Sequence, residues 1–311
     1  MLKEEMLPIK VVSQRTGLTQ HVIRIWEKRY NAVSPTRSDT NRRFYSSQEV
    51  SRLLLLRQAI QNGFTIGQVA QLNNLQLSTL IQETPKEETI SFQDSDSCNH
   101  YLEDSLLAIS EIDTYKLDQV LTKAQVELSP QILIDSLVIP LLSKIGDLWQ
   151  EGKLRIVQEH LASAVIRSFL GRLKSELHPS QIAPKLIVAT PTGQLHELGA
   201  LIVALVAAYQ GWNVIYLGAN LPTEELAKAV EQHQITVIGL SIIYPHDDPY
   251  LHLELKKLSK LLGENVTILV GGQAAMAYQN TLNSINALLM NDLKSLRAKL
   301  AELRVLKSLK N

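Results

Sequence analysis

Cysteine is almost absent from this chain of 311 residues, which contains Cys98 alone. A single thiol excludes an internal disulfide framework and a zinc site built from cysteines. Long apolar runs are also absent: the longest, near 201–208, falls well short of the roughly 20 residues that span a bilayer. The opening sequence, MLKEEMLPIK, has no apolar stretch of the kind found in signal peptides. We therefore expect a cytoplasmic protein without a membrane segment.

Net charge is lacking as well, because 31 basic residues balance 31 acidic ones. The balance conceals a split, since residues 1–75 contain eleven Lys and Arg against five Asp and Glu. A basic unit on an acidic body suggests binding of a polyanion, although a solvated basic face has the same composition. Hydrophobic residues make up 45% of the chain, enough for packed cores. At about 100–200 residues per domain, the length predicts two or three domains.

The spacing of apolar residues divides the chain into four parts. Residues 1–79 are dense in helix signals, and residues 80–99 are acidic and polar, which predicts a linker. Residues 100–180 hold few glycines or prolines and show helical periodicity, which predicts a bundle of about four helices. In 184–311, the apolar runs KLIVAT, NVIYLG, TVIGLSII and VTILVGG alternate with amphipathic helices. This alternation predicts a doubly wound parallel α/β sheet of the Rossmann-like kind, followed by a basic helix from about 291 to 306.

The N-terminal part shows the local signals of a helix-turn-helix. We expect helices at 9–15 and 19–30 around a turn at Gly17, with the Thr19 hydroxyl capping the second helix. An arginine-rich stretch at 34–45 follows, and capping boxes at 46–49 and 65–68 open two further helices. On the second helix we expect a buried face of Val22, Ile25 and Trp26 and a free face of Gln20, His21, Arg24 and Lys28.

The segments IKVVSQRTGLTQHVIRIWEKRY, RSDTNRRFYS and VSRLLLLRQAIQNGFTIGQVA resemble the MerR family of transcription regulators. The resemblance implies a winged helix-turn-helix on double-stranded operator DNA, with the second helix in the major groove and the arginine-rich wing on phosphate and minor groove. The alternative is a small helical domain with a solvated basic face. The resemblance implies these DNA-binding residues: Thr19, Gln20, His21, Arg24, Arg29, Tyr30, Arg37, Arg42 and Arg43.

Three landmarks follow strands of the predicted sheet. The loop TPTGQLHELG after the first strand contains His196 and Gly199, Ser241 lies at the end of the third strand, and Gly271-Gly272 end the fourth. Between Gly199 and Ser241 lie 41 residues, and 27 residues separate the end of the Ser-Ile-Ile run from Gly271. The carboxyl ends of parallel strands share one edge, where open α/β sheets bind ligands. We therefore expect all three landmarks on one rim.

This pattern resembles the cobalamin-binding domain shared by methionine synthase, corrinoid proteins and adenosylcobalamin mutases. The resemblance implies that His196 ligates cobalt from below, and that Gly199, Ser241, Gly271 and Gly272 line the slot for the ligand. Gln194 departs from the family pattern, which has Asp or Glu two residues before the histidine. Its oxygen can still accept a hydrogen bond but adds no charge, so we expect weaker electron donation to cobalt or a vestigial site. An ordinary loop histidine with turn glycines is the alternative.

The segment IGDLWQEGKLRIVQEHLASAVIRSFL resembles helical caps that precede cobalamin domains. Its Trp149-x9-Glu159-His160 arrangement further resembles the light-sensing CarH and LitR group of MerR-type repressors. The resemblance implies adenosylcobalamin as cofactor, with Trp149 shielding the adenosyl group and Glu159 and His160 contacting it. Gln150 stands where this group can have a cobalt-capturing histidine, so no bis-histidine photoproduct is expected from that position. Plain core packing of Trp149 and surface polarity of the Glu-His pair are the alternatives.

These resemblances lead to three functional hypotheses. The first is a non-enzymatic, light-sensing repressor that adenosylcobalamin assembles into a homo-oligomer, from dimer to tetramer, and that light disperses from DNA. The second is a MerR-type regulator whose degenerate sensory domain responds to another ligand or a protein partner without cobalamin. The third is a corrinoid methyl carrier acquired by a regulator.

Overall fold

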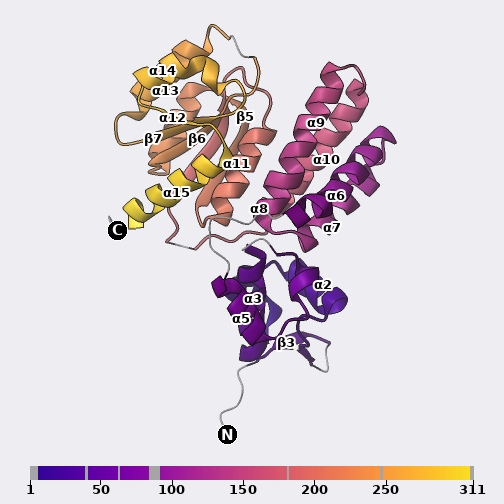
Figure 1. Cartoon of the computed structure of the whole chain (residues 1–311). Coiled ribbons are helices and arrows are strands. Elements are labelled where there is room, and N and C mark those ends of the chain that lie inside the picture. Colours follow the sequence, from indigo (N-terminus) through magenta and orange to yellow (C-terminus); the bar gives the residue numbers. More distant parts are fainter. Residues whose placement is uncertain are drawn as a thin grey trace. The chain divides into compact units, whose positions relative to one another are not determined.

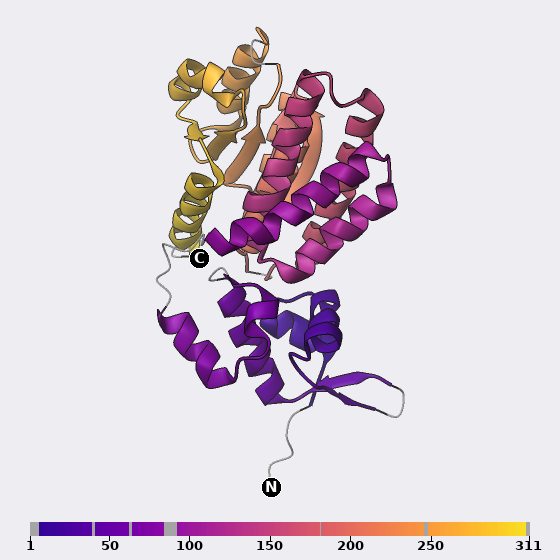
Figure 2. The ribbon, with the colours of Figure 1, turned by 45° about the vertical axis from the view of Figure 1, so that its right-hand side comes forward.

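The computed structural model describes residues 6–38, 41–61, 64–83, 92–180, 182–245 and 248–308. Its contacts divide the chain into two compact units, Met1–Phe169 and Leu170–Asn311, with the boundary inside helix α10. Figures 1 and 2 show a mainly helical first unit and, in the second, a sheet flanked by helices. In the ranges that the structure describes, no helix is both long and apolar enough to cross a membrane.

The N-terminal region of the first unit is a winged helix-turn-helix, as predicted. The Thr19 hydroxyl accepts a hydrogen bond from the Val22 amide at 3.2 Å, which confirms the expected cap of α2. Val22 and Trp26 are buried as predicted, but Ile23 is fully buried where Ile25 was expected, because the core lies on a slightly rotated face of the helix. The elements are β1 (Leu7–Pro8), α1 (Ile9–Thr16), α2 (Gln20–Tyr30), β2 (Thr36–Arg37), β3 (Arg43–Tyr45), α3 (Ser47–Gln61), α4 (Ile66–Val69) and α5 (Asn74–Glu83), with β3 between β1 and β2 in an antiparallel sheet.

A bundle of four helical rods follows, as predicted. The third rod is continuous from α8 through a π-helical turn into α9. Pro140 explains this turn, because its ring clashes with the carbonyl four residues earlier in an α-helix and it donates no N–H. In the widened turn the Ile139 amide donates to Ile134, five residues back. The elements are α6 (Phe92–Ser110), α7 (Thr114–Glu127), α8 (Pro130–Ile132), η1 (Leu133–Val138), α9 (Ile139–Gln150) and α10 (Ile156–Ser175).

The predicted linker at 80–99 is too long. Helix α5 continues to Glu83 and α6 begins at Phe92, so only residues 84–91 of the predicted linker lie outside the described residues. The polar composition of 92–99 hides a helix that is anchored by two buried residues, Cys98 and Tyr101. Tertiary burial thus overrides a local composition that is typical of linkers.

The second unit is a doubly wound parallel sheet of five strands in the order β5-β4-β6-β7-β8. The four predicted strands are confirmed, and the sequence analysis missed β8, which has three residues. The central strands β4 and β6 are almost wholly buried, as expected of parallel strands covered on both faces. The elements are β4 (Lys185–Pro191), α11 (Leu198–Tyr209), β5 (Asn213–Leu221), α12 (Thr223–Gln232), β6 (Val237–Ser241), α13 (Leu251–Leu262), β7 (Thr267–Gly271), η2 (Ala275–Tyr278), α14 (Gln279–Ser284), β8 (Leu288–Met290) and α15 (Leu293–Ser308).

The strand order defines where a ligand would bind. From β4 the chain goes to β5 on one side and then returns to β6 on the other, so the direction of winding reverses between β4 and β6. Helices α11 and α15 pack together on one face, and α12, α13 and α14 on the other (Figure 1). Open α/β sheets bind ligands at such a reversal, outside the carboxyl ends of the strands.

Candidate functional site

The exposed face of α2 presents side chains suited to DNA. His21, Arg24 and Lys28 are all exposed, and their spacing places them along one side of the helix. The guanidinium of Arg24 donates to Gln20 Oε1 at 3.4 Å, which holds two of the predicted DNA-binding residues beside each other. The Thr19 hydroxyl accepts the capping hydrogen bond at the start of α2, so its role in the structure is to stabilise the helix.

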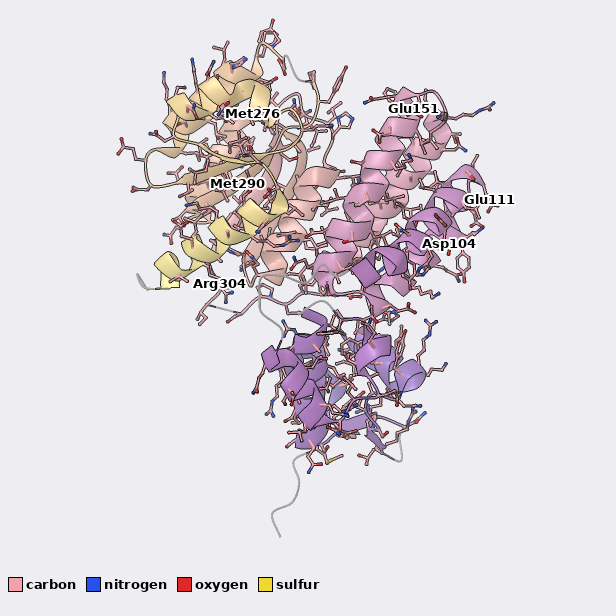
Figure 3. All side chains as sticks on the ribbon, viewed as in Figure 1. Asp104, Glu111, Glu151, Met276, Met290 and Arg304 are labelled. Atoms are coloured by element: carbon pink, nitrogen blue, oxygen red, sulfur yellow. The ribbon has the colours of Figure 1, made fainter. Side chains whose placement is uncertain are left out.

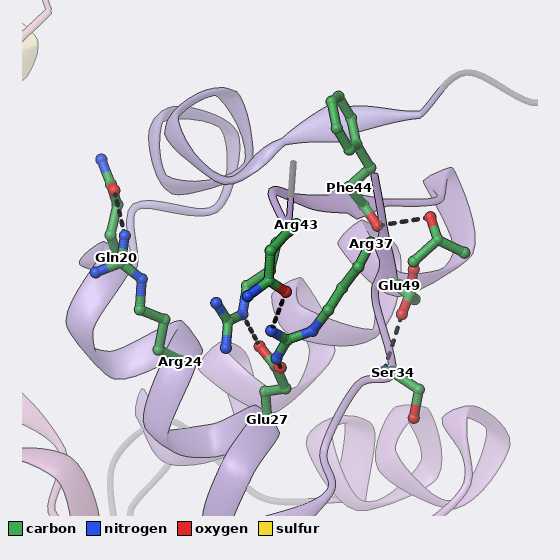
Figure 4. A network of polar contacts seen from close by, with 10 residues as sticks. Gln20, Arg24, Glu27, Ser34, Arg37, Arg43, Phe44 and Glu49 are labelled. Atoms are coloured by element: carbon green, nitrogen blue, oxygen red, sulfur yellow. Dashed lines mark hydrogen bonds and ion pairs between the residues drawn. The ribbon is translucent and has the colours of Figure 1, made fainter. Parts of the chain in front are cut away.

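The arginine-rich wing is fastened to α2 through Glu27. Figure 4 shows the carboxylate between two guanidinium groups, with Glu27 Oε2 2.6 Å from Arg43 Nε and Oε1 3.3 Å from Arg37 Nη2. The hydrogen bond from Arg43 to Glu27 raises the pKa of the guanidinium. Sequence reasoning missed Glu27, although an acid on the basic recognition helix, followed by an arginine-rich wing, was the signal. Of the three predicted wing arginines, Arg42 is exposed and is not one of the two that pair with Glu27.

The carboxyl end of α2 faces the bundle. Arg29 Nη1 lies 3.2 Å from Glu127 Oε1 on α7, and the Trp26 indole donates to the Val126 carbonyl at 3.2 Å. Burial raises the pKa of the Tyr30 hydroxyl to about 12, and the charge and a hydrogen bond of Glu127 act in the same direction. DNA contact by Arg29 and Tyr30 stays a prediction, and the structure gives both residues partners inside the protein.

In the second unit, the landmarks after β4 and β6 meet at the reversal of the sheet. A Cβ on Gly199, at the start of α11, would lie 2.8 Å from Ser241 Oγ and 3.4 Å from the Ile243 side chain. Any larger residue would displace the serine, so the close approach explains the glycine. Two residues with 41 others between them are thus adjacent on one rim, as the spacing predicted.

The glycines after β7 complete that rim. Gly272 has a φ of +107°, which side-chain-bearing residues rarely adopt. A Cβ there would lie 2.3 Å from the carbonyl oxygen of Ile242, the residue after Ser241. A Cβ on Gly271 would lie 3.2 Å from the Met290 carbonyl, at the end of β8 (Met290 is labelled in Figure 3). Bare backbone therefore packs against bare backbone along the carboxyl ends of β6, β7 and β8.

His196 lies on the loop that leaves β4 and is exposed. Tyr244, from the loop after β6, meets its ring edge-on at 5.9 Å between centroids. Asn220 braces the loop, since its Oδ1 accepts from the Gly193 amide and its own amide donates to the Thr190 hydroxyl, both at 2.8 Å. Neither Tyr244 nor Asn220 was expected from the sequence, because neither belongs to a spaced motif.

Gln194 is the departure from the family pattern, and its amide is fixed in orientation. The side chain is 1% exposed, and its Oε1 accepts from the backbone amides of Ile243 at 3.0 Å and Tyr244 at 3.1 Å. The Nε2 group is buried and has no hydrogen-bond partner in the described part of the chain. We expected the oxygen to be available to the histidine, and the structure corrects this, because two backbone donors already occupy it.

The predicted cap residues lie at one end of the bundle. Trp149 is in the last turn of α9, and Glu159 and His160 are near the start of α10. The two helices are joined by a turn whose tip is labelled at Glu151 in Figure 3. Trp149 is 52% exposed, which argues against plain core packing. Glu159 Oε1 accepts from the Ser163 hydroxyl at 2.6 Å, and its other oxygen lies 3.9 Å from His160 Nε2. Ile156 and Val157 are also exposed, so the polar pair lies close along the chain to exposed apolar side chains.

The donor set at the rim of the sheet fits a corrin ligand. Exposed His196 offers one imidazole, and the glycines at 199 and 272 let the segments at the strand ends pack closely against one another. Among the described residues, no cluster of three or more His, Cys, Asp or Glu could hold a metal ion. A single imidazole is the donor set for a metal that arrives with its own macrocyclic ligand.

Comparisons with known families and proteins match three parts of the chain. Family models match as MerR HTH family regulatory protein at residues 7–75, and as B12 binding domain at residues 101–174 and 184–288. The HTH-type transcriptional repressor CarH of Myxococcus xanthus is 28% identical over 283 residues, which cover 89% of this chain and 92% of that protein. The repressor CarA of the same organism is 29% identical over 240 residues, 76% of each chain.

A solved structure supports the fold. The monomethylamine corrinoid protein of Methanosarcina barkeri superposes with a TM-score of 0.53 at 15% identity, covering 65% of this chain and 99% of that one. The chain thus matches the MerR helix-turn-helix model in its N-terminal part and B12 binding domain models in two later parts, and over most of its length it is similar to the HTH-type transcriptional repressors CarH and CarA.

Proposed function

We propose that this protein is a DNA-binding repressor that senses light through adenosylcobalamin. The observation that carries the proposal is the rim of the sheet, where exposed His196 lies on the same edge as the contact between Gly199 and Ser241. The same chain has an N-terminal region that matches the MerR helix-turn-helix. As a DNA-binding regulator it would act in the cytoplasm. It would turn over no substrate, so it is not an enzyme.

The residues divide the work of holding the cofactor. His196 would donate its imidazole nitrogen to cobalt, and Gly199, Ser241, Gly271 and Gly272 would accommodate the nucleotide tail beside the strand ends. Trp149, half exposed, would cover the upper ligand, with Glu159 and His160 forming polar contacts to it. The chemistry that adenosylcobalamin supplies when bound is a cobalt–carbon bond that light breaks. Trp149 would then lose its packing partner, and the end of the bundle would repack around the indole.

Assembly would connect this change to DNA. One DNA-binding region buries a small interface and binds DNA weakly, whereas several such regions in one homo-oligomer bind as a multivalent unit. We infer that cofactor binding in the dark favours a dimer or tetramer and that light disperses it. Loss of assembly would then release the operator without any change in the face of α2.

Absorption spectra and gel filtration test the proposal. Protein purified with adenosylcobalamin in the dark should retain a corrinoid spectrum through desalting, elute as an oligomer, and elute as a smaller species after green light. A colourless protein whose elution is the same with and without the cofactor would refute it. An unchanged elution volume for a coloured protein would refute the light switch alone.

A second function is favoured by the state of Gln194. Because its oxygen is committed to two backbone amides, it offers no acceptor to a cobalt-bound imidazole. A regulator that keeps the fold and responds to another ligand or to a protein partner would tolerate this change. The desalting experiment separates the two functions, since this regulator would lose the corrinoid.

A further inference from the structure

The last turn of α7 takes part in the core of the DNA-binding region. Val126 is 3% exposed and belongs to the same hydrophobic cluster as Trp26. Its carbonyl would be paired, in a longer helix, with the amide of residue 130, but Pro130 has no N–H. The Trp26 indole donates to this carbonyl at 3.2 Å. A hydrogen bond therefore joins the recognition helix to the bundle where α7 ends, and it gives a partner to both the indole N–H and the free carbonyl.

Glu127, the next residue, joins three helices through one carboxylate. Its Oε1 lies 3.2 Å from Arg29 Nη1 on α2, and its Oε2 accepts from the Tyr101 hydroxyl on α6. Tyr30, also on α2, lies close enough to Glu127 for this carboxylate to raise the pKa of its hydroxyl. Burial raises the pKa of the Tyr101 hydroxyl, and the hydrogen bond to Glu127 raises it further. We call these six residues, on α2, α6 and α7, the Glu127 joint: Trp26, Arg29, Tyr30, Tyr101, Val126 and Glu127.

The joint leaves the reading face of α2 accessible. His21, Arg24 and Lys28 remain exposed, while the residues at the carboxyl end of the same helix face α7. Helix α7 packs against α6, and α6 packs against α9, whose last turn carries Trp149. A continuous set of packed helices therefore connects the proposed cap to the recognition helix within one compact unit.

We propose that the Glu127 joint holds the recognition helix on the bundle and transmits changes in the bundle to DNA binding. In this assignment Arg29 and Tyr30 are positioning residues rather than DNA contacts, and Arg24 reads DNA. The regulatory meaning rests on the proposed function, whereas the mechanical connection does not. An arginine that already forms an ion pair with a partly buried carboxylate contributes little to phosphate binding unless that ion pair breaks.

Hydrogen–deuterium exchange on the full-length chain, without cobalamin, tests the connection. Glu127→Gln keeps the shape of the side chain but removes its charge, so we expect about fivefold faster exchange in both α2 and the last turn of α7, the size of one lost hydrogen bond. Glu111→Gln is the matched control, because Glu111 forms an exposed pair with Lys116 at 2.9 Å in the same bundle. Trp26→Phe, which removes the indole N–H together with part of the buried ring system, should accelerate the same two segments. Unchanged exchange in both variants would overturn the joint.

Binding of a generic DNA duplex tests the assignment of Arg29. Arg29→Gln should accelerate exchange in α7 and leave DNA affinity within about twofold, whereas Arg24→Gln should lower affinity and leave α7 unchanged. If Arg29→Gln weakens DNA binding as much as Arg24→Gln and α7 keeps its protection, Arg29 is a DNA contact and the assignment is wrong. Absence of DNA binding by the unaltered chain would refute the proposed function, while the exchange experiment would still decide the joint.

Discussion

Replacing Glu27 by glutamine should loosen the wing and at the same time strengthen non-specific DNA binding. The carboxylate is 13% exposed and pairs with Arg43, whose side chain is 24% exposed, at 2.6 Å. A hydrogen bond between charged groups at such a site contributes about 1.5–3 kcal/mol, and the glutamine retains part of it. The second partner, Arg37, is 45% exposed and adds little. We expect the wing to be destabilised by roughly 1–2 kcal/mol.

The effect on DNA has the opposite sign. Glu27 neutralises two guanidinium groups, and Glu27→Gln would release them toward phosphate. Each additional phosphate contact steepens the dependence of log K on log salt by about 0.9, so the slope should rise in magnitude by up to about two. Sequence-independent affinity at low salt should increase, although the wing is less ordered.

Two measurements on the same variant check this reasoning. Hydrogen–deuterium exchange of peptides containing β2 and β3 reports the wing, and fluorescence anisotropy across a salt series reports DNA binding. Glu225→Gln, which breaks an exposed pair with Lys228 at 3.0 Å on α12, changes the charge equally and controls for it. If Glu27→Gln weakened DNA binding with an unchanged salt slope, Glu27 would order the arginines for phosphate rather than neutralise them, and our account would be refuted.

Four further predictions concern the cofactor and the joint. His196→Ala should abolish retention of cobalamin on desalting and dark assembly on gel filtration; full retention would show that the ligand is assigned wrongly. Trp149→Ala should keep the corrinoid spectrum but lose most of the cofactor-dependent change in elution. Gln194→Glu keeps one oxygen for the two backbone amides and places an acceptor where the unpartnered Nε2 now lies, so cobalamin affinity, measured by titration, should rise about tenfold. Tyr30 has a pKa raised from 10.0 to about 12, so its contribution to stability is present below pH 10 and is lost as pH rises toward 12. Tyr30→Phe should therefore flatten the fall in the free energy of unfolding over that range.

Much of the fold was predictable because its signals are local. Thr19 caps α2, and Ser46 and Glu49 exchange hydrogen bonds at the start of α3, as the sequence indicated. The buried strands of the sheet are continuous apolar runs, and Gly and polar residues follow them. The chain returns through a helix between successive strands, which brings Gly199 beside Ser241 because parallel strands end on one edge.

Features that depend on tertiary contacts were missed. Helix α6 begins in a polar stretch, and its stability comes from burial of Cys98 and Tyr101 rather than from helix propensity. Strand β8 is too short to show a period, and its pairing with β7 supplies its order. Glu27 stands out in the sequence only as an acid among basic residues, because its pairing needs the wing folded back over α2. The role of Glu127 needs α7 at the end of α2 and has no such signal.

Gln194 shows most clearly why the site could be only partly predicted. From residue type alone, an amide can accept or donate, and whether it can accept a hydrogen bond from an imidazole depends on whether its oxygen is available. In the structure two backbone amides donate to the side-chain oxygen, at 3.0 and 3.1 Å. Only the N–H groups of the Gln194 side chain are then left for any other partner. A neutral imidazole that ligates a metal through one nitrogen carries its proton on the other, so it cannot accept from Gln194. The same two backbone donors would hold one oxygen of a glutamate in place and free the second, so Gln194→Glu separates a weakened site from one that never binds the corrinoid.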